Sequence, residues 1–124
     1  QCMRIARDKP ANFLLISGDD LMTVALYAIG AKGVISVLAN AWPLVFKKIK
    51  EFAFAGNYEK ASREIFKILD MNPLMYEEGN PVGLKALLQD MQLCTGTVRL
   101  PLATASESLH KRISAIGKGQ KNKG

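Results

Sequence analysis

Four residues that follow an apolar run have the types and spacing to line a ligand site. Residues 13–16 (FLLI) are apolar at every position, which predicts a parallel strand buried on both faces. The run ends at Ser17-Gly18-Asp19-Asp20, where a glycine would let a ligand approach the backbone closely because it has no side chain. Structural uses stay open: the glycine could serve only the turn, one of the two aspartates could cap the N–H groups of the next helix, and both suit the positive end of its dipole.

Other arrangements that carry chemistry do not occur in the sequence. Cys2 and Cys94 have neither metal-ligand nor CxxC spacing, and we expect them to be reduced thiols in an intracellular protein. His110 is the only histidine, and its basic surroundings predict an exposed surface residue. The sequence contains no phosphate-binding glycine loop and no serine–histidine–acid pattern, so we expect no metal site and no nucleophile of that kind.

The residues around the turn predict a βαβ unit. Leu21, Val24, Ala25 and Ala28 follow at helical spacing, and residues 34–37 (VISV) form a second continuous apolar run. Such a unit crosses over right-handed and places both strands in one parallel sheet. Ligands bind beyond the carboxyl ends of parallel strands, so residues 17–20 and 35–40 are the expected site.

Downstream of the second strand the sequence predicts only helices. A long helix begins at Pro43 and ends at Gly56, in the positions that suit these two residues. Further helices are expected over residues 58–72, 81–93 and 104–116, and a short one over residues 1–9. We therefore predict an α/β fold with one domain in residues 1–56 and a helical C-terminal domain in residues 57–124.

The charge and hydropathy of the chain disfavour two classes of partner. The net charge is +6, but residues 111–124 hold five basic residues and no acid, whereas residues 1–110 are nearly balanced. We interpret the basic end as a solvated, frayed terminus, and no aromatic residues interleave with it as in a nucleic-acid platform. No apolar run approaches the roughly 20 residues of a membrane span. Neither nucleic acid nor a membrane is an expected partner.

Four segments resemble one protein family in the same order. They are GDD after the first strand, GVISVLAN at the second, NPVGLKALLQDM (80–91) and VRLPLATASE (98–107). Together they resemble the C-terminal half of the dihydrodipicolinate synthase family, which are pyruvate-dependent class I aldolases built on a TIM barrel. The resemblance implies that residues 1–56 are the C-terminal portion of a (β/α)8 barrel, including its last two strands. The sequence departs from the family at Gln92, where relatives usually have glycine.

The same resemblance implies two substrate-binding residues. The family position that matches Ile35 contacts bound pyruvate through its backbone carbonyl, and the position that matches Gly18 lines the same pocket; without the resemblance, Ile35 reads as a core residue. The family's Schiff-base lysine, proton-relay tyrosine and orienting threonines lie upstream, so no catalytic residue is expected in this segment. Lys32 precedes the second strand and Lys85 lies in a helix, so neither is placed to form the Schiff base.

For the whole protein the resemblance implies a lyase of lysine and diaminopimelate biosynthesis. It would condense pyruvate, as a lysine Schiff base, with L-aspartate 4-semialdehyde, without a cofactor, as a cytoplasmic homotetramer that includes the upstream half. One alternative is another pyruvate aldolase of the superfamily, similar to N-acetylneuraminate lyase; Asp20 favours the synthase because that branch usually has glutamate there. The other alternative is a non-catalytic half-barrel binding protein, since the Schiff-base lysine is not in this segment.

Overall fold

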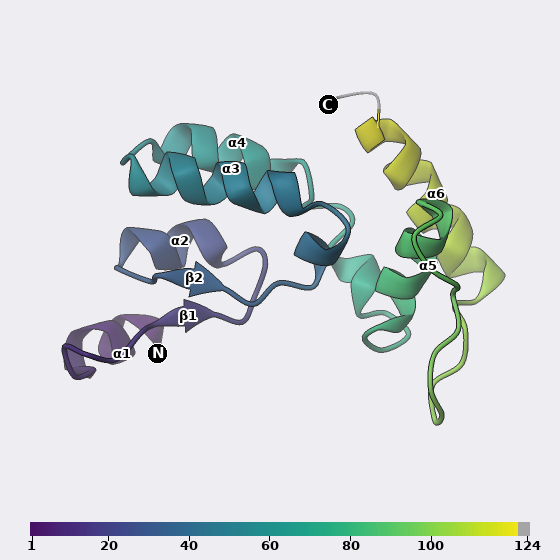
Figure 1. Cartoon of the computed structure of the whole chain (residues 1–124), viewed down its shortest axis with the longest axis horizontal. Coiled ribbons are helices and arrows are strands. Elements are labelled where there is room, and N and C mark those ends of the chain that lie inside the picture. Colours follow the sequence, from purple (N-terminus) through teal and green to yellow (C-terminus); the bar gives the residue numbers. More distant parts are fainter. Residues whose placement is uncertain (122–124) are drawn as a thin grey trace. The chain divides into compact units, whose positions relative to one another are not determined.

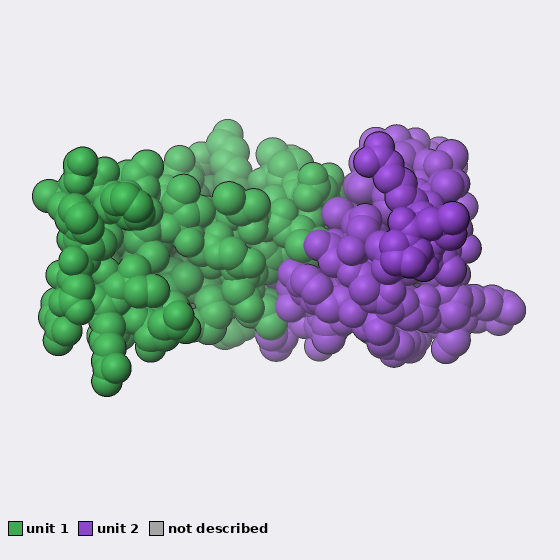
Figure 2. All heavy atoms as spheres, turned by 90° about the horizontal axis from the view of Figure 1, so that it is seen from below, with its two compact units in different colours: residues 1–66 green, residues 67–124 purple. Residues whose placement is uncertain are grey.

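The computed structural model describes residues 1–121 and contains ten helices and strands within them (Figure 1). In chain order they are α1 (Cys2–Asp8), β1 (Ile16–Ser17), α2 (Thr23–Ala28), β2 (Gly33–Val34), the 3-10 helix η1 (Leu38–Asn40), α3 (Pro43–Phe54), α4 (Tyr58–Phe66), the 3-10 helix η2 (Pro73–Met75), α5 (Val82–Asp90) and α6 (Glu107–Lys121). The chain divides into two compact units after Phe66, which Figure 2 shows in green and purple.

The first unit is built on the expected βαβ arrangement. β1 and β2 pair in parallel, with Ile16 opposite Gly33 and Ser17 opposite Val34, and α2 connects them. The helices α2, α3 and α4 pack on one another beside this sheet (Figure 1). Their shared core consists of buried apolar residues from all three helices: Leu26, Tyr27, Phe46, Ile49, Ala53, Ala61 and Ile65. The parallel pairing predicted from the sequence is confirmed.

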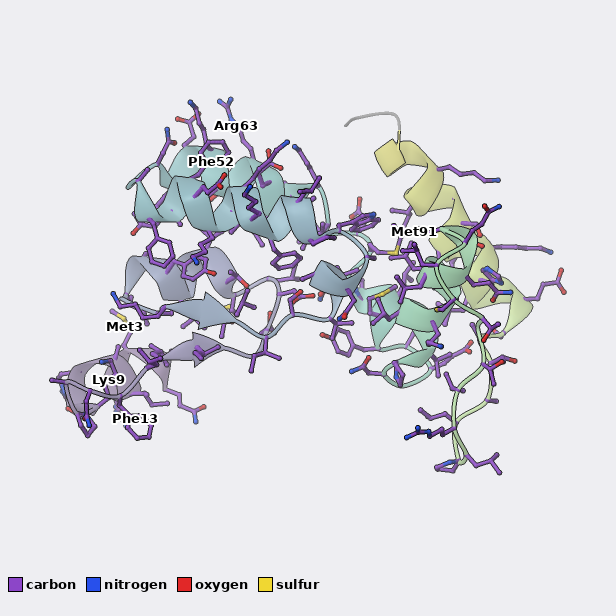
Figure 3. The ribbon with its side chains drawn as sticks, viewed as in Figure 1. Met3, Lys9, Phe13, Phe52, Arg63 and Met91 are labelled. Carbon is purple, nitrogen blue, oxygen red and sulfur yellow. The ribbon has the colours of Figure 1, made fainter. Side chains whose placement is uncertain are left out.

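The strands are shorter and less buried than the sequence predicts. Each strand has two residues in place of the expected four, although hydrogen bonds from Lys32 N–H to Leu15 O (2.8 Å) and from Ile35 N–H to Ser17 O (2.8 Å) extend the pairing. Phe13 is 65% exposed and Ile35 is 76% exposed. In Figure 3 the Phe13 side chain points away from α2, α3 and α4. The expectation that these apolar runs are buried on both faces is therefore wrong for the described part of the chain, because the helices cover only one side of the sheet.

The long third helix has the predicted ends. Pro43 stands in the first turn of α3, where its missing N–H leaves no hydrogen bond unmade. The helix ends at Phe54, and Gly56 has a φ of +75°, a left-handed conformation in which glycine is unstrained. The Asn57 side chain then accepts a hydrogen bond from Lys60 N–H at 3.0 Å, which caps the start of α4. Ala61 and Ile65 of α4 are buried, so α4 belongs to the same compact unit as α3. The two compact units of this chain thus divide after Phe66. The expected boundary at Gly56 separates a barrel from a helical domain in the whole protein, and it stays a prediction.

The second unit consists of η2, α5 and α6. Its buried side chains include Leu74, Met75, Val82, Leu84, Leu87, Leu109 and Ile113. Gly83 allows α5 to lie against η2, since a Cβ built there would stand 2.3 Å from Leu74 O. Helix α6 begins at Glu107 and continues to Lys121. The expected end of the last helix near residue 116 is therefore wrong, since the basic segment from residue 111 is helical as far as Lys121, and Lys123 of that segment lies outside the described residues.

Candidate functional site

The turn after β1 is organised by its own side chains. Ser17 is buried, and its hydroxyl donates to Asp19 O at 2.7 Å and accepts from Asp19 N–H at 3.2 Å. The Asp19 carboxylate accepts hydrogen bonds from Leu21 N–H (2.8 Å) and Met22 N–H (3.0 Å). Because these N–H groups lie just ahead of α2, Asp19 performs the capping role expected from the sequence.

Asp20 has a different partner from its neighbour. It is 1% exposed, and its Oδ2 accepts a hydrogen bond from Leu38 N–H at 2.9 Å. Leu38 begins η1, so the carboxylate links the turn after β1 to the segment after β2. Of the two aspartates, one of which was expected to cap the next helix, Asp19 therefore accepts the local N–H groups and Asp20 does not. The sequence carried no local signal for this contact, because Asp20 and Leu38 are 18 positions apart.

Gly18 and Ile35 lie at the same end of the sheet. Ile35 N–H donates to Ser17 O at 2.8 Å, so the residue before Gly18 is bonded directly to Ile35. Both residues follow the carboxyl ends of parallel strands, which is where ligands bind in α/β folds. A Cβ built on Gly18 would meet no atom within 4 Å, so the space over this backbone is open. The structure thus brings the two predicted residues together, and their role in binding stays a prediction.

The two candidate lysines lie where the sequence placed them. Lys32 directly precedes β2, and its N–H pairs with Leu15 O at the amino end of the strand. Lys85 lies within α5 of the second unit, beside a surface hollow lined also by Arg99 and Leu102. Neither lysine follows the carboxyl end of a described strand, which is where an active-site residue of this fold class is expected.

His110 is only partly exposed, whereas the sequence predicted an exposed surface residue. Its side chain is 33% exposed, and its Nε2 lies 2.8 Å from Asp90 Oδ1. Ser114 donates to the other carboxylate oxygen of Asp90. Partial burial would raise the pKa of Asp90, but the hydrogen bonds from Ser114 and His110 outweigh it and hold that pKa below its usual value. This cluster joins α5 to α6 within the second unit.

Residues 1–121, the part of the chain that the structure describes, contain neither a metal-ligand cluster nor a membrane-spanning helix. No group of three or more histidine, cysteine, aspartate or glutamate side chains in this part of the chain could hold a metal ion. None of the described helices has the length and apolar character needed to cross a membrane. Cys2 and Cys94 are both free.

The fold and the site together define a class of protein. Two parallel strands joined by a helix, with open backbone after their carboxyl ends, are typical of α/β proteins that bind small ligands at that end of the sheet. The sequence profile of the dihydrodipicolinate synthetase family matches residues 1–120, and the chain belongs to this family. The family resemblance found in the sequence is confirmed.

Named relatives and solved structures agree with this assignment. The chain is 46% identical over 112 residues to the 4-hydroxy-tetrahydrodipicolinate synthase of Cytophaga hutchinsonii, covering 90% of this chain and 38% of that protein. It superimposes on dihydrodipicolinate synthase from Aquifex aeolicus with a TM-score of 0.91 and 28% identity, covering 97% of this chain and 41% of that one. It also matches the chloride-inhibited dihydrodipicolinate synthase from Acinetobacter baumannii complexed with pyruvate. That match has a TM-score of 0.88 and 27% identity, and it covers 94% of this chain and 40% of that one. These structures are TIM-barrel enzymes, and the chain spans about two fifths of the length of these relatives.

Proposed function

We propose that the chain is the C-terminal portion of a dihydrodipicolinate synthase and supplies part of its pyruvate pocket. In this proposal residues 1–56 contribute the last two strands of a (β/α)8 barrel, and residues 57–124 form a helical C-terminal domain. The observation that carries the proposal is the hydrogen bond between Ser17 O and Ile35 N–H, which brings Gly18 and Ile35 to one end of the sheet. The family match over residues 1–120 supports it.

The proposed chemistry divides the work between this chain and the rest of the protein. A lysine amine condenses with the ketone of pyruvate and releases water, and the resulting Schiff base loses a methyl proton and attacks the aldehyde of L-aspartate 4-semialdehyde. Gly18 and Ile35 would position pyruvate through their backbone atoms, since Gly18 has no side chain and Ile35 has an apolar one. From the family resemblance the lysine is expected upstream of this chain, and neither Lys32 nor Lys85 follows the carboxyl end of a described strand.

Pyruvate is the substrate with the most support. The A. baumannii structure, which is similar over 94% of this chain, is named as a complex with pyruvate. The similar proteins named above are synthases, which does not favour the alternative related to N-acetylneuraminate lyase. Aspartate semialdehyde as the second substrate, and a role in lysine and diaminopimelate biosynthesis, follow from the synthase assignment.

The apolar surface beside the strands supports an upstream half as the partner. Phe13, Leu14, Ile16 and Ile35 are all exposed, and each is between 45% and 76% accessible. Surface of this kind is typical of an interface with another part of a protein. We therefore include the upstream half of the enzyme as the partner of this face, and, from the family resemblance, assembly as a homotetramer in the cytoplasm.

Trapping the Schiff base tests the proposal directly. The full-length protein that carries this sequence is treated with pyruvate and borohydride, and the modified peptide is identified by mass spectrometry. We expect one pyruvate adduct per subunit, on a lysine upstream of this chain, and turnover when aspartate semialdehyde is added. Absence of an adduct, or an adduct on Lys32 or Lys85, would contradict the proposal.

A further inference from the structure

The carboxylate of Asp20 is the one buried charge at the end of the described strands. Asp20 is 1% exposed and lies two residues after Gly18, yet its partner is Leu38, at the start of η1. We infer that Asp20 is a positioning residue for the pyruvate pocket, which holds the backbone at Gly18 and Ile35 in place through its hydrogen bond to Leu38. The inference rests on the proposed function and adds to it a residue that does not itself contact pyruvate.

Two hydrogen bonds enclose the backbone of the proposed pocket. The first runs from Ile35 N–H to Ser17 O (2.8 Å), and the second from Leu38 N–H to Asp20 Oδ2 (2.9 Å). Gly18 lies between Ser17 and Asp20, which accept these two bonds. The Ile35 carbonyl lies between the N–H groups of Ile35 and Leu38, which donate them. With only the first bond, the chain after Ile35 could rotate about its backbone dihedrals. The second bond restricts that rotation, so we expect the direction of the Ile35 carbonyl to depend on Asp20.

The geometry of η1 separates this bond from ordinary helix capping. Ser36 Oγ accepts from Ala39 N–H at 2.7 Å, which is a local cap within the same segment. Leu38 N–H has no such local acceptor, because the residue three positions before it is Ile35, whose side chain is apolar. The acceptor comes instead from Asp20, across 18 positions in the sequence. A hydrogen bond to a buried carboxylate is stronger than one between neutral groups, so it suits a fixed backbone position.

The surroundings of Asp20 make a substitution easy to interpret. Its other oxygen, Oδ1, is buried and has no hydrogen-bond partner among the described residues. Replacing the side chain therefore removes one described hydrogen bond, the one to Leu38. Asparagine keeps an oxygen that can accept from Leu38 N–H, whereas alanine keeps none. The pair of variants separates the acceptor from the negative charge.

The test uses the full-length protein with Asp20→Ala, Asp20→Asn and the matched control Asn57→Ala. Asn57 also accepts one backbone N–H, that of Lys60, but it lies at the start of α4. We expect Asp20→Ala to raise the KM for pyruvate on the order of tenfold or more, the loss that follows from removing a hydrogen bond to a charged group. Asp20→Asn should stay within about threefold of wild type, since it keeps the acceptor. Asn57→Ala should lower the Tm and leave the pyruvate KM unchanged.

Several outcomes would overturn the inference. A folded Asp20→Ala enzyme with the wild-type KM for pyruvate would show that the bond is structural only, even if its Tm falls. Equal increases in KM for the alanine and asparagine variants would show that the charge acts, and not the acceptor. If Asp20→Ala does not fold, hydrogen exchange of the backbone amides in the wild-type protein tests the hydrogen bond between Leu38 and Asp20. Leu38 N–H should be strongly protected, and its rapid exchange would contradict this hydrogen bond and with it the inference. A wild-type protein that forms no pyruvate adduct would instead overturn the proposed function and this inference with it.

Discussion

Asp19 and Asp20 are adjacent in the chain, but the carboxylate of Asp19 binds N–H groups two and three residues ahead of it, whereas that of Asp20 binds an N–H group 18 positions ahead. Asp19 accepts from the N–H groups of Leu21 and Met22, directly ahead of α2, whereas Asp20 accepts from Leu38 N–H beyond β2. The first contact is local and organises the turn. The second crosses from one strand end to the other, so the pair both forms the turn and attaches it to the neighbouring strand.

Gly18→Val in the full-length protein should reduce pyruvate binding while the fold is kept. Apart from its two chain neighbours, a Cβ at Gly18 meets no atom within 4 Å, so the backbone there has room for a side chain. It would occupy the open space where pyruvate is proposed to lie. We expect the pyruvate KM to rise at least about tenfold with little change in Tm. Gly119→Val on α6, which also meets nothing within 4 Å, is the control and should leave KM unchanged. If Gly18→Val binds pyruvate with wild-type affinity, Gly18 does not line the pyruvate pocket.

Gly83→Ala should destabilise the second unit. Its Cβ would stand 2.3 Å from Leu74 O and 2.8 Å from Met75 Cα, and both are backbone atoms that cannot move without shifting η2. We expect a loss of about 1–3 kcal/mol in the free energy of unfolding, measured by urea denaturation. Gly117→Ala is the control, because its nearest neighbour, Leu87 Cδ1, lies 3.5 Å away in ordinary contact. That variant should gain about 0.5–1 kcal/mol from helix propensity. Equal stabilities for the two variants would show that α5 does not lie this close to η2.

Gln92→Gly should stabilise the chain. Gln92 has a φ of +60°, a left-handed conformation that strains a residue with a Cβ and that glycine adopts freely. It follows the end of α5, at a position where glycine is the preferred residue. We expect the free energy of unfolding to rise by about 0.5–1 kcal/mol. Gln92→Ala keeps the Cβ and should give no such gain, so a similar increase in both variants would point away from backbone strain.

Stability should fall on acidification partly through Asp90. Hydrogen bonds from Ser114 and His110 hold its pKa below the usual value despite partial burial, so the folded state binds a proton at this carboxyl less readily than the unfolded state does. The stabilisation is therefore present above the ordinary aspartate pKa of about 4 and is lost as the pH falls through the lower, folded-state value. Asp90→Asn should have a Tm that depends less on pH between about pH 5 and pH 3.

A control for this effect is Glu59→Gln. Glu59 forms an ion pair with Arg63 at 2.5 Å, but the two side chains are 76% and 69% exposed, and Arg63 extends outward from α4 (Figure 3). Solvent screens such a pair, so its removal should leave the pH dependence of the Tm close to wild type. The same pH dependence in Asp90→Asn as in wild type would exclude Asp90 as a contributor.

The chain expressed by itself should self-associate and form no pyruvate adduct. Phe13, Leu14 and Ile35 expose apolar side chains next to two parallel strands, and unpaired strand edges favour association. Co-expression with the upstream half should increase the soluble fraction, measured by size-exclusion chromatography. A monodisperse monomer with a cooperative thermal transition would show that the chain is an independent domain.

The sequence by itself determined the features that depend on neighbours a few residues away. The apolar runs and the helical spacing between them predicted the parallel βαβ unit, and Pro43 and Gly56 marked the first turn and the end region of α3. These are local properties, because periodicity, proline and glycine act on the backbone within one or two turns. The family resemblance likewise depended on four short segments, and the profile match over residues 1–120 confirms it.

Only the tertiary structure decided which distant groups meet. The bond from Leu38 to Asp20 and the contact of His110 with Asp90 join residues 18 and 20 positions apart, and each depends on how whole elements pack. The exposure of Ile35 likewise depends on what covers the sheet, which its apolar side chain cannot specify. Sequence patterns identify the face on which a residue lies, but the partner on that face is set by strand register and helix packing, which arise from the chain as a whole.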